Sequence, residues 1–123
     1  MWYEYIALLL SVPVIMIITG IIMVKKPPKE INSLVGYRTK RSMKNISTWN
    51  FAQKLCGDMM KKHGITMVIC SMLIFCVIQV LEKQAATDVC MVVLMSQLIV
   101  LLCIPVITEQ ELDNTFDSDG QLR

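Results

Sequence analysis

The chain has 123 residues, of which 54 % are apolar and 18 % are charged, and its formal net charge is +2. Soluble domains average about 45–50 % apolar and about 25 % charged residues, so this composition excludes a water-soluble enzyme. The length allows one domain at most, and we expect a single membrane domain over residues 1–123.

Three long stretches carry no charged side chain, if His63 is counted as neutral. They have 20, 19 and 20 residues and are the segments 5–24, 63–81 and 89–108. At 1.5 Å rise per residue, each reaches roughly 30 Å as a helix, which matches the hydrocarbon core of a bilayer. We therefore predict an all-α integral membrane protein with spans at about 5–24, 64–81 and 89–107.

The first span is predicted to be retained in the membrane and not to be a signal peptide. No Lys or Arg precedes its apolar run, which is longer than a signal sequence needs, and no small-residue cleavage site follows. Residues 25–28, Lys-Lys-Pro-Pro, follow instead and are typical of a basic anchor and a helix stop.

The basic residues predict the orientation. Segment 25–62 holds ten of the twelve Lys and Arg against two acids, a net +8, whereas loop 82–88 holds one Lys and two acids. By the positive-inside rule, segment 25–62 is cytoplasmic. We therefore expect the N-terminus and loop 82–88 outside and the C-terminus inside, with an outer aromatic belt made by Trp2, Tyr3 and Tyr5.

Segment 25–62 is expected to begin as a loop and to continue as a helix. From about Ser42 the pattern predicts a cytoplasmic amphipathic helix that lies on the membrane surface between spans 1 and 2, with Trp49 as an interface anchor. An alternative is that Trp49 and Asn45 face the spans and help to build a site. Asn45 falls on the apolar face, where its side chain needs a hydrogen-bond partner.

The stretch from Gly36 to Asn45 combines a flexible turn with four cations and several short polar donors. Such a set can hold a phosphate, a lipid headgroup or an acidic peptide. The alternative is that Lys40, Arg41 and Lys44 only set the topology, since any cytoplasmic loop carries such cations.

Residues 108–123 form an acidic tail, with five acids, one Arg and a net charge of −4. Thr108 followed by Glu111 is a capping-box pattern, which predicts that a short new helix begins as the third span ends. Because tail and basic loop share one membrane face, we expect them to dock. The residues proposed for this contact are Arg38 or Arg41 on the loop and acids such as Glu109 and Glu111 on the tail.

No metal site or cofactor is expected. The five cysteines show no metal-ligand spacing, and His63 has no evident partner, so the ligand count is too low. Within the spans, Gln79 and Gln97 are costly to bury, and we expect them to bond each other or to line a site. No span contains Asp, Glu, Lys or Arg, which argues against an ion-coupled transporter.

One segment resembles a known family, the SdpI/YfhL family. The residues that carry the resemblance are Gly36, Tyr37, Arg38, Thr39, Ser42, Asn45, Trp49 and Ala52. The tail sequence from Thr108 to Leu112 is also similar to the ending of that family. The match covers roughly residues 34–64 and 108–120 and the three-span layout.

The resemblance implies a multi-pass protein of the bacterial cell membrane that acts as an immunity protein and gives toxin resistance. The family is named for a protein that protects its producer from a secreted killing peptide, the sporulation-delaying toxin, and that is thought to hold a cytoplasmic repressor at the membrane. The implied partners are membrane lipids, a secreted antimicrobial peptide toxin and a cytoplasmic repressor protein, with no direct nucleic-acid binding.

The chain resembles the short members of the family and departs from the pattern at some positions. Residues 46–48 are Ile-Ser-Thr where acids are usual, and Gln53 and Leu55 stand where an Asn and an aromatic residue are usual. Alternative functions are a small membrane transporter component or a lipid-headgroup-binding membrane protein. An enzyme is not expected, because the sequence shows no nucleophile with a general base at a recognisable spacing.

Overall fold

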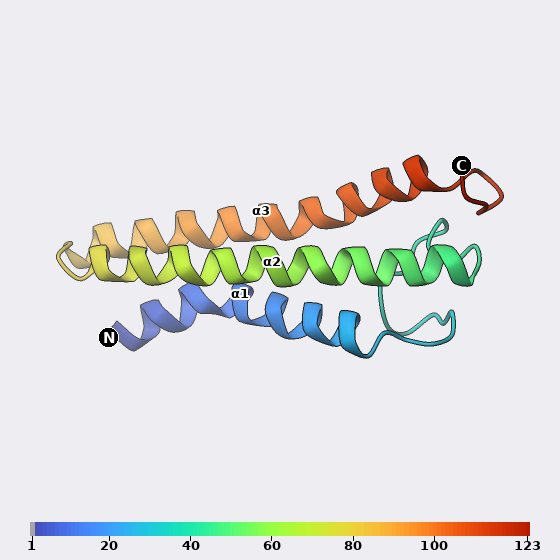
Figure 1. Ribbon diagram of the computed structural model, residues 1–123. Coiled ribbons are helices and arrows are strands. Elements are labelled where there is room, and N and C mark those ends of the chain that lie inside the picture. The colour runs from blue at the N-terminus through green and yellow to red at the C-terminus, as the bar shows by residue number, and fades with distance from the viewer. Residues whose placement is uncertain (1) are drawn as a thin grey trace.

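The computed structural model describes residues 2–123, which form three long helices. They are α1 (Trp2–Lys25), α2 (Ile46–Ile78) and α3 (Lys83–Thr115). The helices lie side by side, and α2 runs antiparallel to both α1 and α3 and lies between them in the view of Figure 1. Loop 26–45 and the C-terminus share one end of the bundle, and the N-terminus and the α2–α3 turn share the other.

All three helices are long and apolar enough to cross a membrane, which confirms the all-α, three-span expectation. Their outer faces carry large apolar side chains that stay exposed, among them Ile15, Leu73 and Leu102. Apolar faces of this extent suit contact with lipid, and helices satisfy their own backbone polar groups there. The chain is therefore a multi-pass membrane protein.

The predicted interfacial helix is wrong. Residues 46–78 form one continuous helix of 33 residues that begins after the N-cap Asn45, not at about Ser42. Trp49, expected as an interface anchor, is fully buried inside the protein. An amphipathic pattern shows that one face is covered, but not by what: here the protein's own loop covers it. At roughly 50 Å, α2 is longer than a hydrocarbon core and projects beyond it.

The predicted new helix at Thr108 is also wrong, because α3 continues without a break to Thr115. The Thr108 hydroxyl donates to the carbonyl of Ile104 at 2.9 Å, so it bonds back to its own helix and does not cap a new one. The acidic residues that follow therefore lie on a rigid extension of the third span.

α1 and α2 cross at glycines that lack the bulk to separate them. A Cβ atom added to Gly20 would lie 2.6 Å from the carbonyl oxygen of Gly57 and 2.6 Å from the backbone nitrogen of Lys61. One added to Gly64, further along α2, would lie 2.7 Å from a side-chain carbon of Ile17. Small residues of this kind let membrane helices approach backbone to backbone.

A polar cluster joins all three helices deep in the bundle. Pro13 has no N–H, so the carbonyl of Leu9 lacks its usual partner within α1. The Ser71 hydroxyl donates to this carbonyl at 3.1 Å. The Gln97 amide donates to the same carbonyl and to the Ser71 oxygen, both at 3.0 Å. Pro13 therefore creates the acceptor that α2 and α3 bind.

Gln79 and Gln97 do not bond each other. Gln79 donates to the carbonyl of Phe75 within its own helix at 3.3 Å. The Gln97 side-chain oxygen is buried and has no hydrogen-bond partner among the described residues. Gln97 thus fixes α3 to the other helices through its amide nitrogen alone.

Candidate functional site

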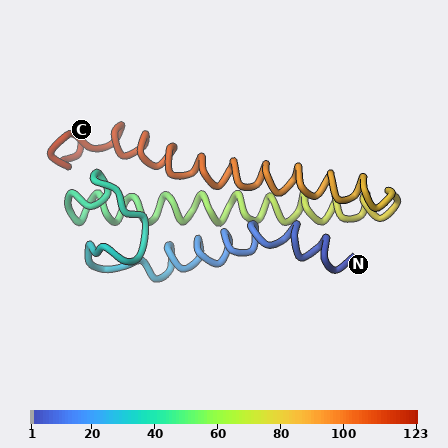
Figure 2. Tube along the Cα trace, turned by 180° about the vertical axis from the view of Figure 1, so that it is seen from behind, coloured from blue at the N-terminus to red at the C-terminus, as the bar shows by residue number. Residues whose placement is uncertain are grey.

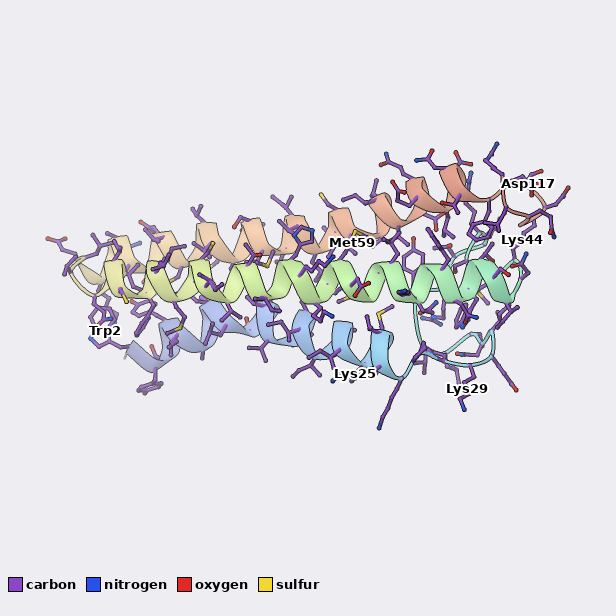
Figure 3. The ribbon with its side chains drawn as sticks, viewed as in Figure 1. Trp2, Lys25, Lys29, Lys44, Met59 and Asp117 are labelled. Atoms are coloured by element: carbon purple, nitrogen blue, oxygen red, sulfur yellow. The ribbon has the colours of Figure 1, made fainter. Side chains whose placement is uncertain are left out.

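The residues of the Gly36–Ala52 stretch gather at one end of the bundle, which we call the polar end. It comprises loop 26–45, residues 46–56 of α2 and residues 105–123. Figure 2 shows the loop passing across α2, from the end of α1 toward the end of α3. In Figure 3, Lys44 and Asp117 lie at the tip of this end, and Trp2 lies at the opposite end of the molecule.

Gln53 holds the centre of the loop. Its side-chain oxygen accepts the backbone N–H of Tyr37 at 2.7 Å, and its amide donates to the Tyr37 carbonyl at 2.8 Å. Gly36 has φ +100°, and a Cβ there would lie 2.6 Å from the Gln53 oxygen. The glycine is required for both its backbone conformation and this close approach. Gln53 is fully buried, so this pair of bonds is shielded from water.

The Tyr37 side chain connects the loop to α3. Its hydroxyl lies 2.8 Å from a carboxylate oxygen of Glu109 and 3.0 Å from the carbonyl of Pro105, and donates to them. Burial is the main reason that the pKa of Tyr37 rises above its usual range, and the bond to Glu109 adds to it. Tyr37 therefore stays neutral and acts as a hydrogen-bond donor.

Ser42 and Thr39 close the next turn of the loop reciprocally. The Thr39 N–H donates to the Ser42 hydroxyl oxygen at 2.8 Å, and the Ser42 N–H donates to the Thr39 hydroxyl oxygen at 3.1 Å. The Ser42 hydroxyl also lies 3.1 Å from the Tyr37 carbonyl, to which it donates. Ser42 is fully buried, so it is a structural residue of the loop.

Asn45 caps α2 and binds the tail. Its side-chain oxygen accepts the Thr48 N–H at 2.9 Å, and the Thr48 hydroxyl accepts the Asn45 N–H at 3.1 Å, which is a capping box. Its amide donates to the carbonyl of Gly120 at 2.6 Å. Gly120 has φ +79°, and a Cβ there would lie 2.5 Å from the Asn45 amide nitrogen. The hydrogen-bond partner that we expected for the Asn45 side chain is therefore the carbonyl of Gly120 in the tail.

Two further residues of the stretch lie in the core of the polar end. The Trp49 indole N–H donates to the carbonyl of Pro28 at 2.8 Å and ties the start of the loop to α2. Ala52 is fully buried in a cluster with Leu112 and Phe116. The absence of a larger side chain at Ala52 lets α3 and the tail pack directly on α2.

The ion pairs between loop and tail are formed by Arg41 and not by Arg38. The Arg41 guanidinium pairs with Asp113 and lies 3.8 Å from a carboxylate oxygen of Glu109. The bond to Asp113 raises the pKa of Arg41. Arg38 donates instead to the carbonyl of Ser33 within the loop. Glu111 is exposed, and no ion pair forms on it within residues 2–123.

The polar end therefore brings together most of the residues that the sequence singled out, but some of its main contacts come from other positions. Gln53, Thr48, Asp113 and Gly120 were not predicted as site residues. A polar side chain on an apolar helix face was the available signal for Gln53 and Thr48. In the part of the chain that the structure describes, no group of three His, Cys, Asp or Glu side chains is placed to hold a metal.

Comparison with known proteins places this geometry in context. A model described as the SdpI/YfhL protein family matches residues 29–108, which include most of the loop, all of α2 and most of α3. A Bacillus subtilis (strain 168) protein named uncharacterized protein YfhL is 45 % identical over 51 residues. That alignment covers 42 % of this chain and 46 % of the relative, or about half of the length of the curated protein. No solved structure gives a significant match.

Proposed function

The chain belongs to the SdpI/YfhL family, and we propose that it is a membrane immunity protein that protects its cell from a membrane-active peptide toxin. The observation that carries this proposal is the family match over residues 29–108, which includes most of the loop that Gln53, Asn45 and Trp49 hold in place. The proposed location is the bacterial cell membrane.

The proposed orientation puts the polar end in the cytoplasm, with the N-terminus and the α2–α3 turn outside. The net +8 of segment 25–62 supports this orientation. A secreted peptide would then first meet Trp2, Tyr5 and the α2–α3 turn, and could lie along the exposed apolar faces of the helices. This arrangement gives the toxin and the polar end opposite sides of the membrane.

The polar end is the proposed output side, where a cytoplasmic repressor protein would bind. The continuity of α2 supports this division, because a single helix connects the outer turn to Trp49 and Gln53. A displacement of α2 at its outer end would therefore reach the loop directly. Membrane lipids are the remaining proposed partner.

The proposed role is binding and not catalysis. Within residues 2–123, the buried hydroxyl and amide side chains of the polar end bond backbone groups of the loop, of the helix cap or of their own helix; they are Ser42, Thr48, Gln53 and Thr108. Groups held in this way fix a surface and are not free to attack a substrate.

The proposal is tested by expressing the full chain in a toxin-sensitive bacterium and challenging it with the sporulation-delaying peptide. We expect higher survival than in a strain with the empty vector, at a membrane protein level confirmed by immunoblot. Unchanged survival at a normal protein level would overturn the immunity role against that toxin.

The role of the polar end is tested with Trp49→Phe, which keeps an aromatic ring in the core but removes the bond to Pro28. Val92→Ala is the matched control, because Val92 is exposed on the apolar face of α3. We expect both variants to accumulate normally and the repressor to be lost from the membrane fraction with Trp49→Phe alone. Equal repressor retention in both would contradict an output role for the loop.

A further inference from the structure

A cavity of about 300 Å³ lies in the polar end between the loop, the first turn of α2 and the tail. Four cations and two acids line it: Lys40, Arg41, Lys44 and Arg123, with Asp113 and Asp117. Leu112 and Phe116 contribute apolar surface to its wall. The loop cations of the cavity precede its charged tail residues by 69 to 83 positions in the sequence, and only the docking of the tail onto the loop makes them a single site.

Both acids of the cavity are already bound by the protein. Asp113 pairs with Arg41, and a terminal nitrogen of Arg123 lies 3.8 Å from the same carboxylate. The Asp117 carboxylate accepts the backbone N–H groups of Asp119 and Gln121, each at 2.9 Å. Both carboxylates of the cavity are therefore occupied by contacts within its wall and within the turn at residues 117–121.

Lys40 and Lys44 are the cations of the cavity with which these two acids do not pair. Both are exposed, and within residues 2–123 no carboxylate lies within 4.0 Å of either ammonium group. Ser118 adds a hydroxyl to the wall. A concave surface lined by uncompensated charge of one sign concentrates counter-ions, and two ammonium groups beside a hydroxyl offer charge-assisted hydrogen bonds to an anion.

We propose that this cavity binds the phosphate group of a soluble small molecule. A phosphate carries a charge near −2 at neutral pH and three acceptor oxygens, which match the two unpaired lysines and the Ser118 hydroxyl. A carboxylate would neutralise only one of the lysines. The inference is independent of the proposed immunity function, because it rests on the charge and shape of the polar end.

The position of the cavity favours a soluble ligand over a lipid phosphate. The apolar run of α3 ends at Ile107, and the cavity residues Asp113 and Phe116 lie six and nine residues further along. At 1.5 Å per residue these positions are roughly 9 and 13 Å beyond the apolar run. A headgroup layer is only roughly 5–8 Å thick, so the cavity opens into water beyond it.

The test uses the full chain purified in a neutral detergent, with inorganic phosphate and pyrophosphate as the probes. Binding is measured by calorimetry at about 0.15 M salt, where long-range surface attraction is screened. We expect the wild type to bind at least one of the probes. No binding of either probe would overturn the proposal.

The site is assigned with the double variant Lys40→Gln and Lys44→Gln. The matched control is Lys29→Gln and Lys54→Gln, which removes the same charge from exposed lysines that do not line the cavity. We expect an affinity loss of about tenfold or more in the first variant and an unchanged affinity in the control. An equal loss in both would show general charge attraction and overturn the site.

An experiment in lipid nanodiscs distinguishes a soluble phosphate compound from a lipid headgroup as the ligand. We expect pyrophosphate to bind equally in discs of neutral phosphatidylcholine and in discs that contain anionic phosphatidylglycerol. Loss of pyrophosphate binding in the anionic discs would show that a lipid headgroup occupies the cavity, and would overturn the soluble ligand.

Discussion

The crossing of α1 and α2 and the polar end are held together by opposite means. At the crossing, Gly20, Gly57 and Gly64 remove side chains so that the two backbones touch. At the polar end, side chains such as Gln53 and Asn45 reach across to bond backbone groups of the loop and tail. The crossing depends on the absence of side chains, and the polar end depends on the presence of hydrogen-bonding side chains.

The difference follows from what each region packs, which is helix against helix at the crossing and an irregular loop and tail at the polar end. In lipid, apolar side chains gain nothing by leaving their surroundings, so helices associate through close packing and a few polar contacts. In water, a loop of irregular structure must satisfy each buried backbone group. The crossing therefore tolerates little added volume, whereas the polar end tolerates little loss of a hydrogen-bonding group.

The largest expected effect is at the crossing, from Gly20→Leu. The Cβ alone would lie 2.6 Å from backbone atoms of Gly57 and Lys61, so the helices must separate. We expect a loss of about 3 kcal/mol or more in the free energy of unfolding, measured by denaturant titration in detergent. Ala7→Leu is the control, because Ala7 is exposed on the same helix. If both variants were equally stable, the crossing would not depend on the glycine.

A smaller effect is expected at the polar end from Gln53→Leu. This change leaves the partly buried N–H of Tyr37 without its partner and removes one of the two donors to the Tyr37 carbonyl, which keeps its bond to Ser42. We expect a loss of about 1–3 kcal/mol and faster proteolysis within loop 26–45, with the spans still protected. Gln84→Leu is the control, because its amide bonds only to Asp88 on the surface of α3. Equal loop proteolysis in both variants would contradict the role of Gln53.

The polar cluster in the spans is expected to contribute less. Gln97→Leu removes the amide from the Leu9 carbonyl, which keeps its bond to Ser71. We expect a loss of about 0.6–1.7 kcal/mol in the free energy of unfolding. Pro13→Ala gives the Leu9 carbonyl a partner within α1, so the effect of Gln97→Leu should shrink in that background. An undiminished effect in the double variant would show that Pro13 does not create the acceptor.

The smallest expected effect is a loosening of the tail at low pH. The backbone N–H of Gln121, and also that of Asp119, hold the pKa of Asp117 below its usual range. The folded pKa is lowered, so this stabilisation is present above the unfolded value of about 3.9 and is lost as pH falls through the folded value. We expect the protection factor of the Gln121 amide, which corrects for the intrinsic pH dependence of exchange, to fall only in that acidic range. Asp117→Asn should abolish this pH dependence, and an Asp117 carboxyl that titrates at its ordinary value would contradict it.

The sequence predicted the elements better than their ends. The charge-free stretches located all three spans, but α2 and α3 extend well beyond them. The Thr108 and Glu111 spacing fits a cap, yet a threonine inside a helix can bond back to its own turn, as Thr108 does. Local patterns of this kind have two readings, and the packing of the neighbouring chain selects one.

The candidate site was predicted in part. The sequence identified Gly36, Tyr37, Asn45 and Trp49, and these residues do converge at the polar end. It did not identify Gln53, because a buried glutamine on an apolar helix face looks like an imperfection until its backbone partner is known. It also left the choice between Arg38 and Arg41 open, because both are cations of the same loop.

By itself, the sequence determined that the protein is helical, crosses the membrane three times and concentrates its cations in one segment, residues 25–62. Transfer energies act on each residue separately and can be summed along the chain. Only the tertiary structure decided that Trp49 is covered by protein, that Gly20 meets Gly57, and that the tail closes a basic cavity over the loop. These features depend on residues distant in sequence, because close packing and hydrogen bonds need both partners in place.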